Sequence, residues 1–286
     1  MPEALAELPV RGRSRRQLAT VLSTHGVLIA GAFCMVAPFI WEFLTSLKTQ
    51  TSATRIPPRL TPDGQWSNYS QVFHLVPFGH QFVNTVLMTA GRTAGQVLFC
   101  SMAAYAFARL TFPGRNIIFG VLLAILMVPP QLFIIPQYQI MADLHWLNSL
   151  QALIVPGLFS SFGIFLLRQF FASLPRELDE AARLDGAGPV RTFVLIILPL
   201  ARPGLTALAI LTALWSWNDL LWPLVVNTSP SKMTLSAGLT SLQGQFLTNY
   251  PVLMAGSLLA SVPLIIVFVI AQRQFIEGIA LTGSKG

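Results

Sequence analysis

The chain has 286 residues, of which 53% are hydrophobic and only 10% are charged, and its mean hydropathy is +0.64. Soluble domains carry about a quarter charged residues, so this composition excludes an ordinary water-soluble protein. The formal net charge of +7 does not indicate nucleic-acid binding. Its arginines border apolar segments and do not alternate with exposed aromatic residues on a polar scaffold.

Six apolar segments dominate the chain. A transmembrane helix needs about 20 mainly apolar residues, because the hydrocarbon core is about 30 Å thick and an α-helix rises about 1.5 Å per residue. The segments that meet this condition are 24–47, 78–107, 117–141, 150–170, 203–226 and 252–274. We therefore expect an all-α integral membrane protein, with a six-helix transmembrane domain over 24–274, an N-terminal segment 1–23 and a C-terminal tail 275–286.

The cationic residues indicate how these spans are oriented. Cytoplasmic loops of membrane proteins carry an excess of Lys and Arg. One set of loops, which includes both termini, holds thirteen cations, whereas the opposite set holds only Lys48, Arg55, Arg59 and Lys232. Both termini are therefore predicted to be cytoplasmic, as an even number of spans requires.

Arg92, the remaining cation, falls near the middle of the second span. An arginine at the centre of a membrane helix is unfavourable by about 2.5 to 3.5 kcal/mol on insertion scales, so it should face protein or water and have a partner. Asp219 is the clearest intramembrane carboxylate, and Glu42 is the alternative. Arg92 either lines a cavity, where it binds solute hydroxyls or a phosphate, or forms a structural ion pair.

The third span contains Pro129, Pro130 and Pro136 beside Gln131. Prolines within a membrane helix produce kinks, because they remove a main-chain donor and clash with the preceding turn. Such kinks can shape a cavity. Gln131 is therefore a candidate residue of a solute pathway, although the prolines themselves are expected to act through the kink and not by contact.

The longest cytoplasmic loop, 171–202, predicts two short helices joined by a tight turn. Pro175 can begin the first helix, whose first turn holds the acidic residues that suit a helix N-terminus: Glu177, Asp179 and Glu180. This helix should end near Leu184, before a turn at 186–188 in which glycine permits a positive φ. Pro189 can then begin the second helix. Small side chains at Ala181 and Ala182 and the apolar Leu184 suit the approach of a partner.

The fifth span ends in a mixed aromatic and polar cluster: Trp215, Trp217, Asn218, Asp219 and Trp222. Sugars need ring faces for their C–H groups and hydrogen-bonding partners for their hydroxyls, so the cluster is a candidate sugar pathway. Tryptophan is equally typical of the membrane interface. Asn218 and Asp219 are the stronger pathway candidates, because an amide and a carboxylate are costly to leave facing lipid.

The spaced pattern Glu180-Ala181-Ala182, Gly186 and Ile196-Ile197-Leu198-Pro199 resembles the EAA loop of ABC importer permeases. In that family the loop forms a coupling helix that docks into a cleft of the cytoplasmic ATPase subunit. The resemblance therefore implies a docking role for 176–188. Its expected ATPase-coupling residues are Glu180, Ala181, Ala182, Leu184, Asp185 and Gly186.

Four further segments resemble the carbohydrate branch of this family, typified by the smaller six-span permease of the maltose transporter. They are 103–109 (AAYAFAR), 128–131 (VPPQ), 217–219 (WND) and 221–223 (LWP). The resemblance covers nearly all of the chain and implies a type I ABC importer permease fold in a bacterial inner membrane. It also implies a non-catalytic chain with three kinds of partner: a second permease subunit, two ATPase subunits that hydrolyse ATP, and an extracytoplasmic solute-binding protein.

Two more segments gain an expected role from the same resemblance. The tail residues Gly283, Lys285 and Gly286 match an ending that reaches into the interface of the ATPase dimer, although Thr282 and Ser284 depart from that ending. The outer loop 241–249 aligns with a segment that probes the sugar cleft of the binding protein. Gln243 and Gln245 are thus candidates for releasing solute, and a plain solvated loop is the alternative.

No cofactor and no metal are expected. Cys34 and Cys100 fall within spans, the four histidines lack metal-ligand spacing, and the chain has no phosphate-binding loop or hydrolase motif. Two other classes also fit the hydropathy. An ion-coupled secondary transporter should show inverted repeats or paired broken helices, and a structural membrane protein needs no pathway at all. For the ABC permease class, the solute is expected to be a sugar or a sugar-like compound, with glycerol 3-phosphate as the alternative.

Overall fold

The computed structural model of the chain describes residues 15–244 and 248–283, with side chains for 23–244, 248–270 and 272. Every regular element in these ranges is helical. The elements in chain order are α1 (Arg15–Ser46), α2 (Gln50–Ala53), α3 (Ser67–Leu75), α4 (Phe78–Arg109), α5 (Arg115–Ile125), η1 (Pro130–Phe133), α6 (Ile134–Asp143), α7 (Leu150–Ile154), η2 (Val155–Gly157), α8 (Ser161–Ser173), α9 (Glu177–Leu184), α10 (Pro189–Thr192), the π-helix η3 (Phe193–Ile197), α11 (Leu198–Leu200), α12 (Arg202–Trp217), α13 (Leu221–Val226), α14 (Leu235–Leu239), η4 (Thr240–Leu242) and α15 (Tyr250–Gly283).

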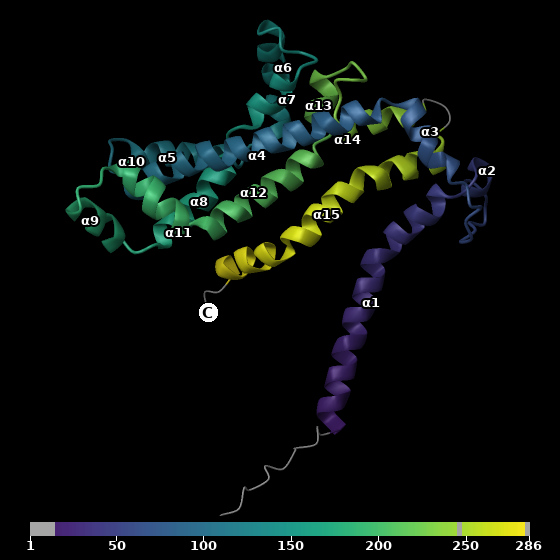
Figure 1. Cartoon of the computed structure of the whole chain (residues 1–286), viewed down its shortest axis with the longest axis horizontal. Helices are drawn as coiled ribbons and strands as arrows, with labels where there is room; N and C mark the ends of the chain where they lie inside the picture. Colours follow the sequence, from purple (N-terminus) through teal and green to yellow (C-terminus); the bar gives the residue numbers. More distant parts are fainter. Residues whose placement is uncertain (1–14, 245–247, 284–286) are drawn as a thin grey trace, which may run out of the picture.

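Helix α4 is the element around which the others are arranged. It is continuous over 32 residues, which corresponds to a length of about 48 Å at 1.5 Å per residue. Helices α8 and α12 pack along it, and α15 packs beside α12 and α3 (Figure 1). Figure 1 also shows α6, α7 and α13 gathered on the other side of α4 from α12 and α15.

Three clusters of buried apolar side chains follow one another along α4. Phe78, in its first turn, belongs to a cluster with residues of α3, α14 and α15. Met88 belongs to a second cluster with α6, α7 and α13, and Cys100 to a third with α8, η3 and α12. Because α4 contributes to all three clusters, protein side chains cover one side of it along its whole length.

Three stretches of the described chain are long and apolar enough to span a membrane: Ser23–Ser46, Leu150–Ser173 and Tyr250–Ile270. They overlap the predicted spans 24–47, 150–170 and 252–274. Two strongly bent helix pairs, Arg115–Ile125 with Pro130–Asp143 and Pro189–Leu200 with Arg202–Trp217, raise the number to five if each pair is one span.

The predicted spans 117–141 and 203–226 are not single helices. The first is bent by 98° after Ile125, and the second breaks at Asn218 to Leu220, between α12 and α13. A proline ring clashes with the carbonyl four residues earlier and supplies no N–H to it. Ile125 lies four residues before Pro129, and Asp219 lies four residues before Pro223, so each break falls where this rule places it.

The predicted second span, 78–107, falls within α4, which is long enough but not apolar enough to count among the candidate spans. Its buried residues include polar ones, among them Gln81, Thr85, Arg92 and Ser101. These side chains face neighbouring helices and not the outside of the bundle. A helix that is covered by protein on one side along its whole length does not need a uniformly apolar surface, which explains why α4 differs from the other long helices.

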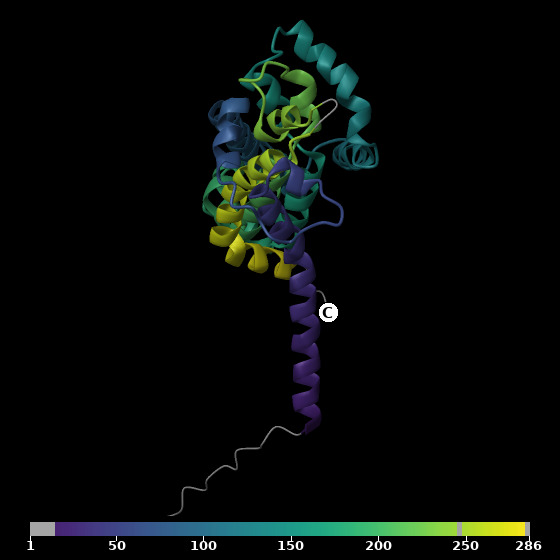
Figure 2. The ribbon, with the colours of Figure 1, turned by 90° about the vertical axis from the view of Figure 1, so that its right-hand side faces the viewer.

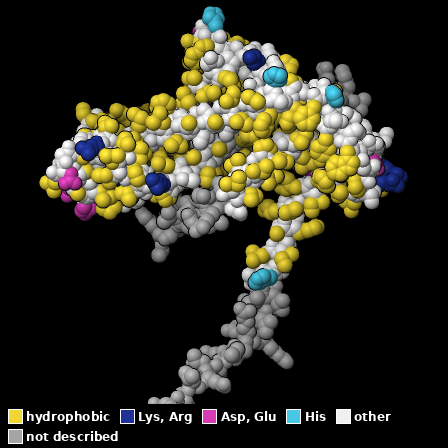
Figure 3. All heavy atoms as spheres, in the orientation of Figure 1, with side chains coloured by type: hydrophobic (Ala, Val, Ile, Leu, Met, Phe, Trp, Pro, Cys, Tyr) yellow, Lys and Arg dark blue, Asp and Glu magenta, His cyan; other side chains and the backbone are white. Residues whose placement is uncertain are grey.

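Helix α1 lies largely apart from the bundle. Nearly every residue from 23 to 40 is exposed, and the packing of α1 against α15 is confined to one end (Figures 1 and 2). On the face drawn in Figure 3, apolar side chains cover most of the surface, whereas acidic ones are seen at its two ends, chiefly at the end where α9 lies. Such an apolar exterior suits a lipid environment.

Substitution of Leu167 should reveal how much the third cluster contributes to stability. Leu167 is fully buried between α8 and its neighbours, so Leu167→Ala should cost about 2 to 4 kcal/mol through the cavity that it leaves. Leu98 is 54% exposed on α4, and Leu98→Ala should have a much smaller effect. Thermal unfolding of both variants in the same detergent would measure the difference. Equal unfolding temperatures would contradict the packing described here.

Candidate functional site

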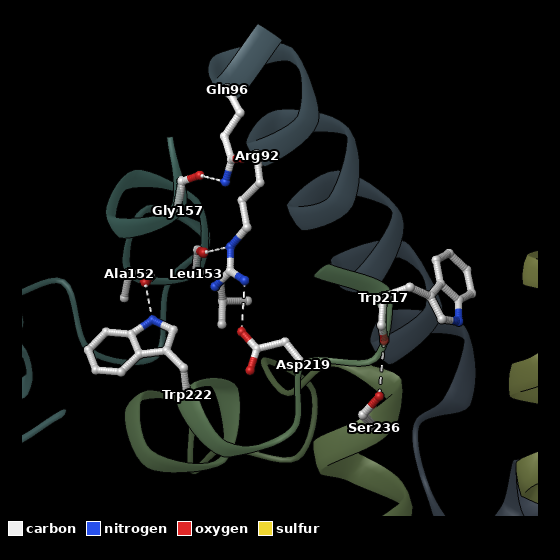
Figure 4. A network of polar contacts seen from close by, with 9 residues as sticks. All are labelled: Arg92, Gln96, Ala152, Leu153, Gly157, Trp217, Asp219, Trp222 and Ser236. Carbon is white, nitrogen blue, oxygen red and sulfur yellow. Dashed lines mark hydrogen bonds and ion pairs between the residues drawn. The ribbon is translucent and has the colours of Figure 1, made fainter. Parts of the chain in front are cut away.

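Arg92 on α4 is buried and makes two strong contacts. Its Nη1 lies 2.7 Å from Oδ2 of Asp219, and its Nε donates to the carbonyl oxygen of Leu153 at 2.7 Å (Figure 4). The side chain of Arg92 is 9% exposed and that of Asp219 is 23% exposed. Of the two partners considered from the sequence, Asp219 is therefore confirmed, and Glu42 is not the one.

The broken helices position both members of this pair. Asp219 lies between α12 and α13, so the chain turns there and its carboxylate reaches α4 (Figure 4). The guanidinium passes directly over Gly157 in η2, where a Cβ atom would lie 2.6 Å from Cδ and Nε of Arg92. Any side chain at position 157 would therefore displace the arginine.

Gln96, one turn after Arg92 on α4, continues the polar contacts. Its Nε2 donates to the carbonyl oxygen of Gly157 at 2.9 Å, and its Oε1 accepts from the Thr212 hydroxyl of α12 at 2.9 Å. Arg92 and Gln96 thus bind main-chain oxygens of the segment 153–157, in which α7 gives way to η2. Figure 4 shows both side chains directed from α4 toward this segment.

A cavity of about 300 Å³ opens beside the ion pair. Its lining residues are Arg92, Pro130, Gln131, Ile134, Gln137, Pro156, Gly157, Asp219, Leu221 and Trp222. Three of the four predicted pathway residues, Arg92, Gln131 and Asp219, are therefore brought together although they are far apart in sequence. The fourth, Asn218, lies elsewhere: it lines a separate cavity of about 310 Å³ between α12, α14 and α15, together with Gln243.

The tryptophans of the fifth span do not form one cluster. Trp222 is buried, and its Nε1 donates to the carbonyl oxygen of Ala152 at 2.9 Å. Trp217 donates to the carbonyl oxygen of Ala260 on α15 at 3.1 Å, and Figure 4 shows the two rings on opposite sides of Asp219. Trp215 is 54% exposed and packs edge-on against Phe162. The break at 218–220 separates these rings. The prediction that they form one mixed aromatic and polar cluster was therefore wrong.

The cavity beside Arg92 offers hydrogen bonds without a net charge. Gln131 and Gln137 each carry an amide that can donate and accept, and the opposite charges of Arg92 and Asp219 are paired. Such a set suits hydroxyl groups. Among the side chains that the structure describes, no three His, Cys, Asp or Glu residues lie close enough to hold a metal ion.

Several residues of this site were not predicted. Gln96 and Gln137 are amides within apolar segments, a signal that could have identified them, because polar groups inside a membrane are costly and often functional. Gly157 gave no such signal, since its role is to leave room for Arg92. Trp222 was a candidate, but its contact with Ala152 depends on the fold.

The loop 171–202 forms the predicted pair of helices. Helix α9 begins at Glu177, with its acidic residues in the first turn, and α10 begins at Pro189. Gly186 has φ of +77°, as predicted for the turn. The N–H groups of Gly186 and Ala187 donate to the carbonyl oxygens of Arg183 and Ala182 at 3.0 and 2.8 Å, which is the Schellman arrangement that ends a helix at a left-handed residue.

The outer face of α9 is free in this chain. Glu180, Ala181 and Asp185 are exposed, and Leu184 is 90% exposed. Ala182 differs, because it is only 3% exposed and faces its own bundle. The sequence suggested that its small size would allow a partner to approach. In the structure its small size instead allows α9 to pack against the rest of the chain.

The remaining predicted residues lie at the two ends of α15. Gln243 precedes α15 and is exposed, whereas Gln245 lies outside the described residues. At the other end, α15 extends to Gly283, and Lys285 and Gly286 lie outside the described residues. Their proposed contacts remain predictions.

The family model and the related proteins that match this chain are all membrane components of transport systems. The family described as "Binding-protein-dependent transport system inner membrane component" matches residues 96–280. The chain is 38% identical over 263 residues to the arabinooligosaccharides transport system permease protein AraQ of Halalkalibacterium halodurans, which covers 89% of this chain and 93% of that protein. It is 34% identical over 264 residues to the sn-glycerol-3-phosphate transport system permease protein UgpE of Yersinia enterocolitica, covering 89% and 94%.

The fold is also that of a solved ABC transporter structure. That structure is the crystal structure of a bacterial ABC transporter involved in the import of the acidic polysaccharide alginate, with a TM-score of 0.78, 24% identity, and coverage of 91% of this chain and 98% of that chain. At this identity the likeness concerns the fold alone. The family match spans more than half of the chain, and the chain therefore belongs to the binding-protein-dependent transport system inner membrane components, the multi-pass permease subunits of ABC importers.

Proposed function

We propose that this chain forms one half of the translocation pathway of a sugar importer, and that it docks to a cytoplasmic ATPase through α9. The observation that carries the docking role is the exposed face of α9 around Glu180 and Leu184, held by the left-handed turn at Gly186. An apolar side chain that is 90% exposed at the end of the molecule suits a buried contact with a partner.

The proposed topology has six spans with both termini in the cytoplasm. Five spans come from the three apolar stretches and the two bent pairs, and α4 is the sixth because it has the necessary length and lies among the other spans. The excess of Arg near α9, α5 and the N-terminus supports a cytoplasmic position for those segments.

The proposed partners are a second permease subunit, two ATPase subunits and an extracytoplasmic solute-binding protein. In this arrangement the chain is non-catalytic, and ATP binding and hydrolysis on the ATPases alternate the pathway between its two openings. Gln243 and Gln245 would face the binding protein, and Gly283, Lys285 and Gly286 would reach the ATPase interface. The family match supports an ATP-driven importer over an ion-coupled secondary transporter.

The proposed solute is an uncharged sugar or oligosaccharide. The relatives named above are permeases for arabino-oligosaccharides and for glycerol 3-phosphate, so relatedness alone supports both classes. The cavity favours the first class, because the guanidinium of Arg92 is already paired with Asp219 at 2.7 Å. A phosphate monoester would have to compete with that carboxylate for the guanidinium.

Purification of the tagged chain in mild detergent tests the assembly. We expect a second permease and an ATPase to copurify, identified by mass spectrometry. The reconstituted complex, supplied with its binding protein, should import labelled arabinotriose faster than labelled sn-glycerol 3-phosphate. If the chain is recovered from intact membranes without other subunits, the proposed assembly is wrong. If sn-glycerol 3-phosphate is imported faster than arabinotriose, the proposed solute class is wrong.

Two pairs of substitutions test the docking face. Gly186→Val should abolish import, because a β-branched residue at φ +77° costs roughly 1 kcal/mol or more, whereas Gly186→Asn should retain it, since Asn tolerates this conformation. Apart from residues 185 to 187 themselves, no atom lies within 4 Å of a Cβ at position 186, so a clash with the rest of the chain does not contribute.

The second pair changes charge on the same helix. Glu180→Lys should abolish import, while Glu177→Lys, in the same first turn but outside the matched motif, should have a much smaller effect. Membrane insertion should be unchanged in all four variants and is measured by quantitative blotting of membranes. Full import by both Gly186→Val and Glu180→Lys would rule out the docking role.

Arg92→Gln distinguishes a pathway residue from a structural ion pair. We expect normal expression and assembly with at least about a tenfold loss of import, because the amide cannot replace a charged, hydrogen-bonded guanidinium. Arg92→Lys serves as the control that keeps the charge but not the planar fork. If Arg92→Gln instead fails to assemble and the added change Asp219→Asn restores both assembly and import, the pair is structural and the pathway role is wrong.

A further inference from the structure

Arg109, the last residue of α4, contacts the end of α8, the start of α9 and the connector between them. Nη2 of Arg109 donates to the carbonyl oxygens of Phe171 and Leu174 at 2.6 and 2.7 Å. Nη1 lies 2.8 Å from Oδ2 of Asp179 in the first turn of α9 and 3.4 Å from the carbonyl oxygen of Pro175. The side chain of Arg109 is only 4% exposed.

These contacts join helix ends of opposite polarity. Phe171 lies in the last turn of α8, where a cation is favourable, and its carbonyl oxygen also accepts from the N–H of Leu174 at 3.3 Å. Asp179 lies in the first turn of α9, where an anion is favourable. The guanidinium of Arg109 therefore caps the C-terminal end of α8 and pairs with the first turn of α9. It can do both because its N–H donors lie in one rigid plane.

Tyr105 makes the corresponding contact with the second helix of the loop. It lies one turn before Arg109 on α4, and its hydroxyl donates to the carbonyl oxygen of Pro189, the first residue of α10, at 3.1 Å. Its ring lies 4.9 Å from the ring of Phe193. The last turn of α4 thus contacts both helices of the loop.

The main chain by itself would leave α9 able to rotate. Only Leu174, Pro175 and Arg176 join α8 to α9, and the turn at 185–188 with Gly186 joins α9 to α10. Hinges of this kind absorb changes in φ and ψ. The ion pair of Arg109 with Asp179 ties α9 to α4, in addition to the packing of the buried Ala182.

Arg109 and Arg92 lie on the same unbroken helix. They are 17 positions apart in α4, which has no break between Phe78 and Arg109 and places them about 25 Å apart along the axis. A movement of α9 that displaces Arg109 would therefore also displace Arg92, because the helix between them is unbroken.

We infer that Arg109 is a positioning residue of transport coupling: with Asp179 it fixes α9 to α4, so that movement of α9 reaches the cavity beside Arg92. This inference rests on the proposed docking of α9 to an ATPase. A purely structural cap would stabilise the end of α8 but would not transmit a change between the two sites.

The test follows the state of the cavity directly and needs no knowledge of the solute. In the full importer complex with Cys34→Ser, the exposed Gln131 of the cavity is changed to Cys, and its rate of reaction with a maleimide is measured without nucleotide and after trapping with ATP and vanadate. Cys100 stays in place because it is buried. We expect the two rates to differ roughly fivefold or more in the otherwise unchanged chain.

Arg109→Lys and Asp179→Asn should abolish this difference while the complex still hydrolyses ATP. Asp179→Asn removes only the ion pair and leaves the carbonyl contacts of Arg109, so it decides the matter if Arg109→Lys does not assemble. Arg115→Lys is the matched control, because the Arg115 guanidinium donates to the nearby carbonyl oxygen of Leu110 and forms no ion pair among the residues that the structure describes, and it should keep the difference.

The outcomes separate this inference from the proposed function. Retention of the nucleotide-dependent difference in Asp179→Asn, or in Arg109→Lys where that variant assembles, overturns the positioning role and leaves docking intact. A reference complex whose two rates are equal contradicts the proposed coupling itself. Loss of the difference in Arg115→Lys as well as in the two test variants would show a general loss of structure and would also overturn the specific role of Arg109.

Discussion

The structure depends on how main-chain carbonyl groups are satisfied where its helices break. In a bilayer, an unpaired carbonyl has no water to bind, so irregular backbone persists only where protein groups pair with it. Here α4 supplies those groups: Arg92 binds the carbonyl oxygen of Leu153, and Gln96 binds that of Gly157. The break beside Arg92 is compatible with a membrane protein because polar side chains of α4, together with Trp222 of α13, bind the carbonyl oxygens of this segment.

This constraint explains why apolarity alone does not reveal every helix of the bundle. Helix α4 contributes to all three buried clusters and contains the arginine and glutamine that the breaks require. Helix α4 is consequently less apolar than the other long helices, although it lies at the centre of the bundle. Helix α1 shows the opposite case: it is exposed over nearly its whole apolar length and packs against α15 only near one end.

Local rules anticipated a large part of the site. The turn at Gly186, the start of α10 at Pro189 and the pairing of Arg92 with Asp219 follow from residue type and the cost of burying a charge, and the structure contains all three. The separation of Trp217 from Trp222 and the passage of Arg92 over Gly157 could not be anticipated, because they depend on the direction that the chain takes after a break. Arg109 was counted as a cytoplasmic cation and as the end of the 103–109 match, since nothing local indicates that it contacts both α8 and α9.

The pairing of Arg92 with Asp219 has a consequence for the driving force of transport. One elementary charge that crosses the membrane field exchanges about 2.3 kcal/mol with each 100 mV of membrane potential. Two opposite charges held 2.7 Å apart move as a unit without net charge, so the potential does almost no work on them. As long as the pair moves intact, it adds no voltage dependence to a rearrangement of this cavity around the proposed uncharged solute.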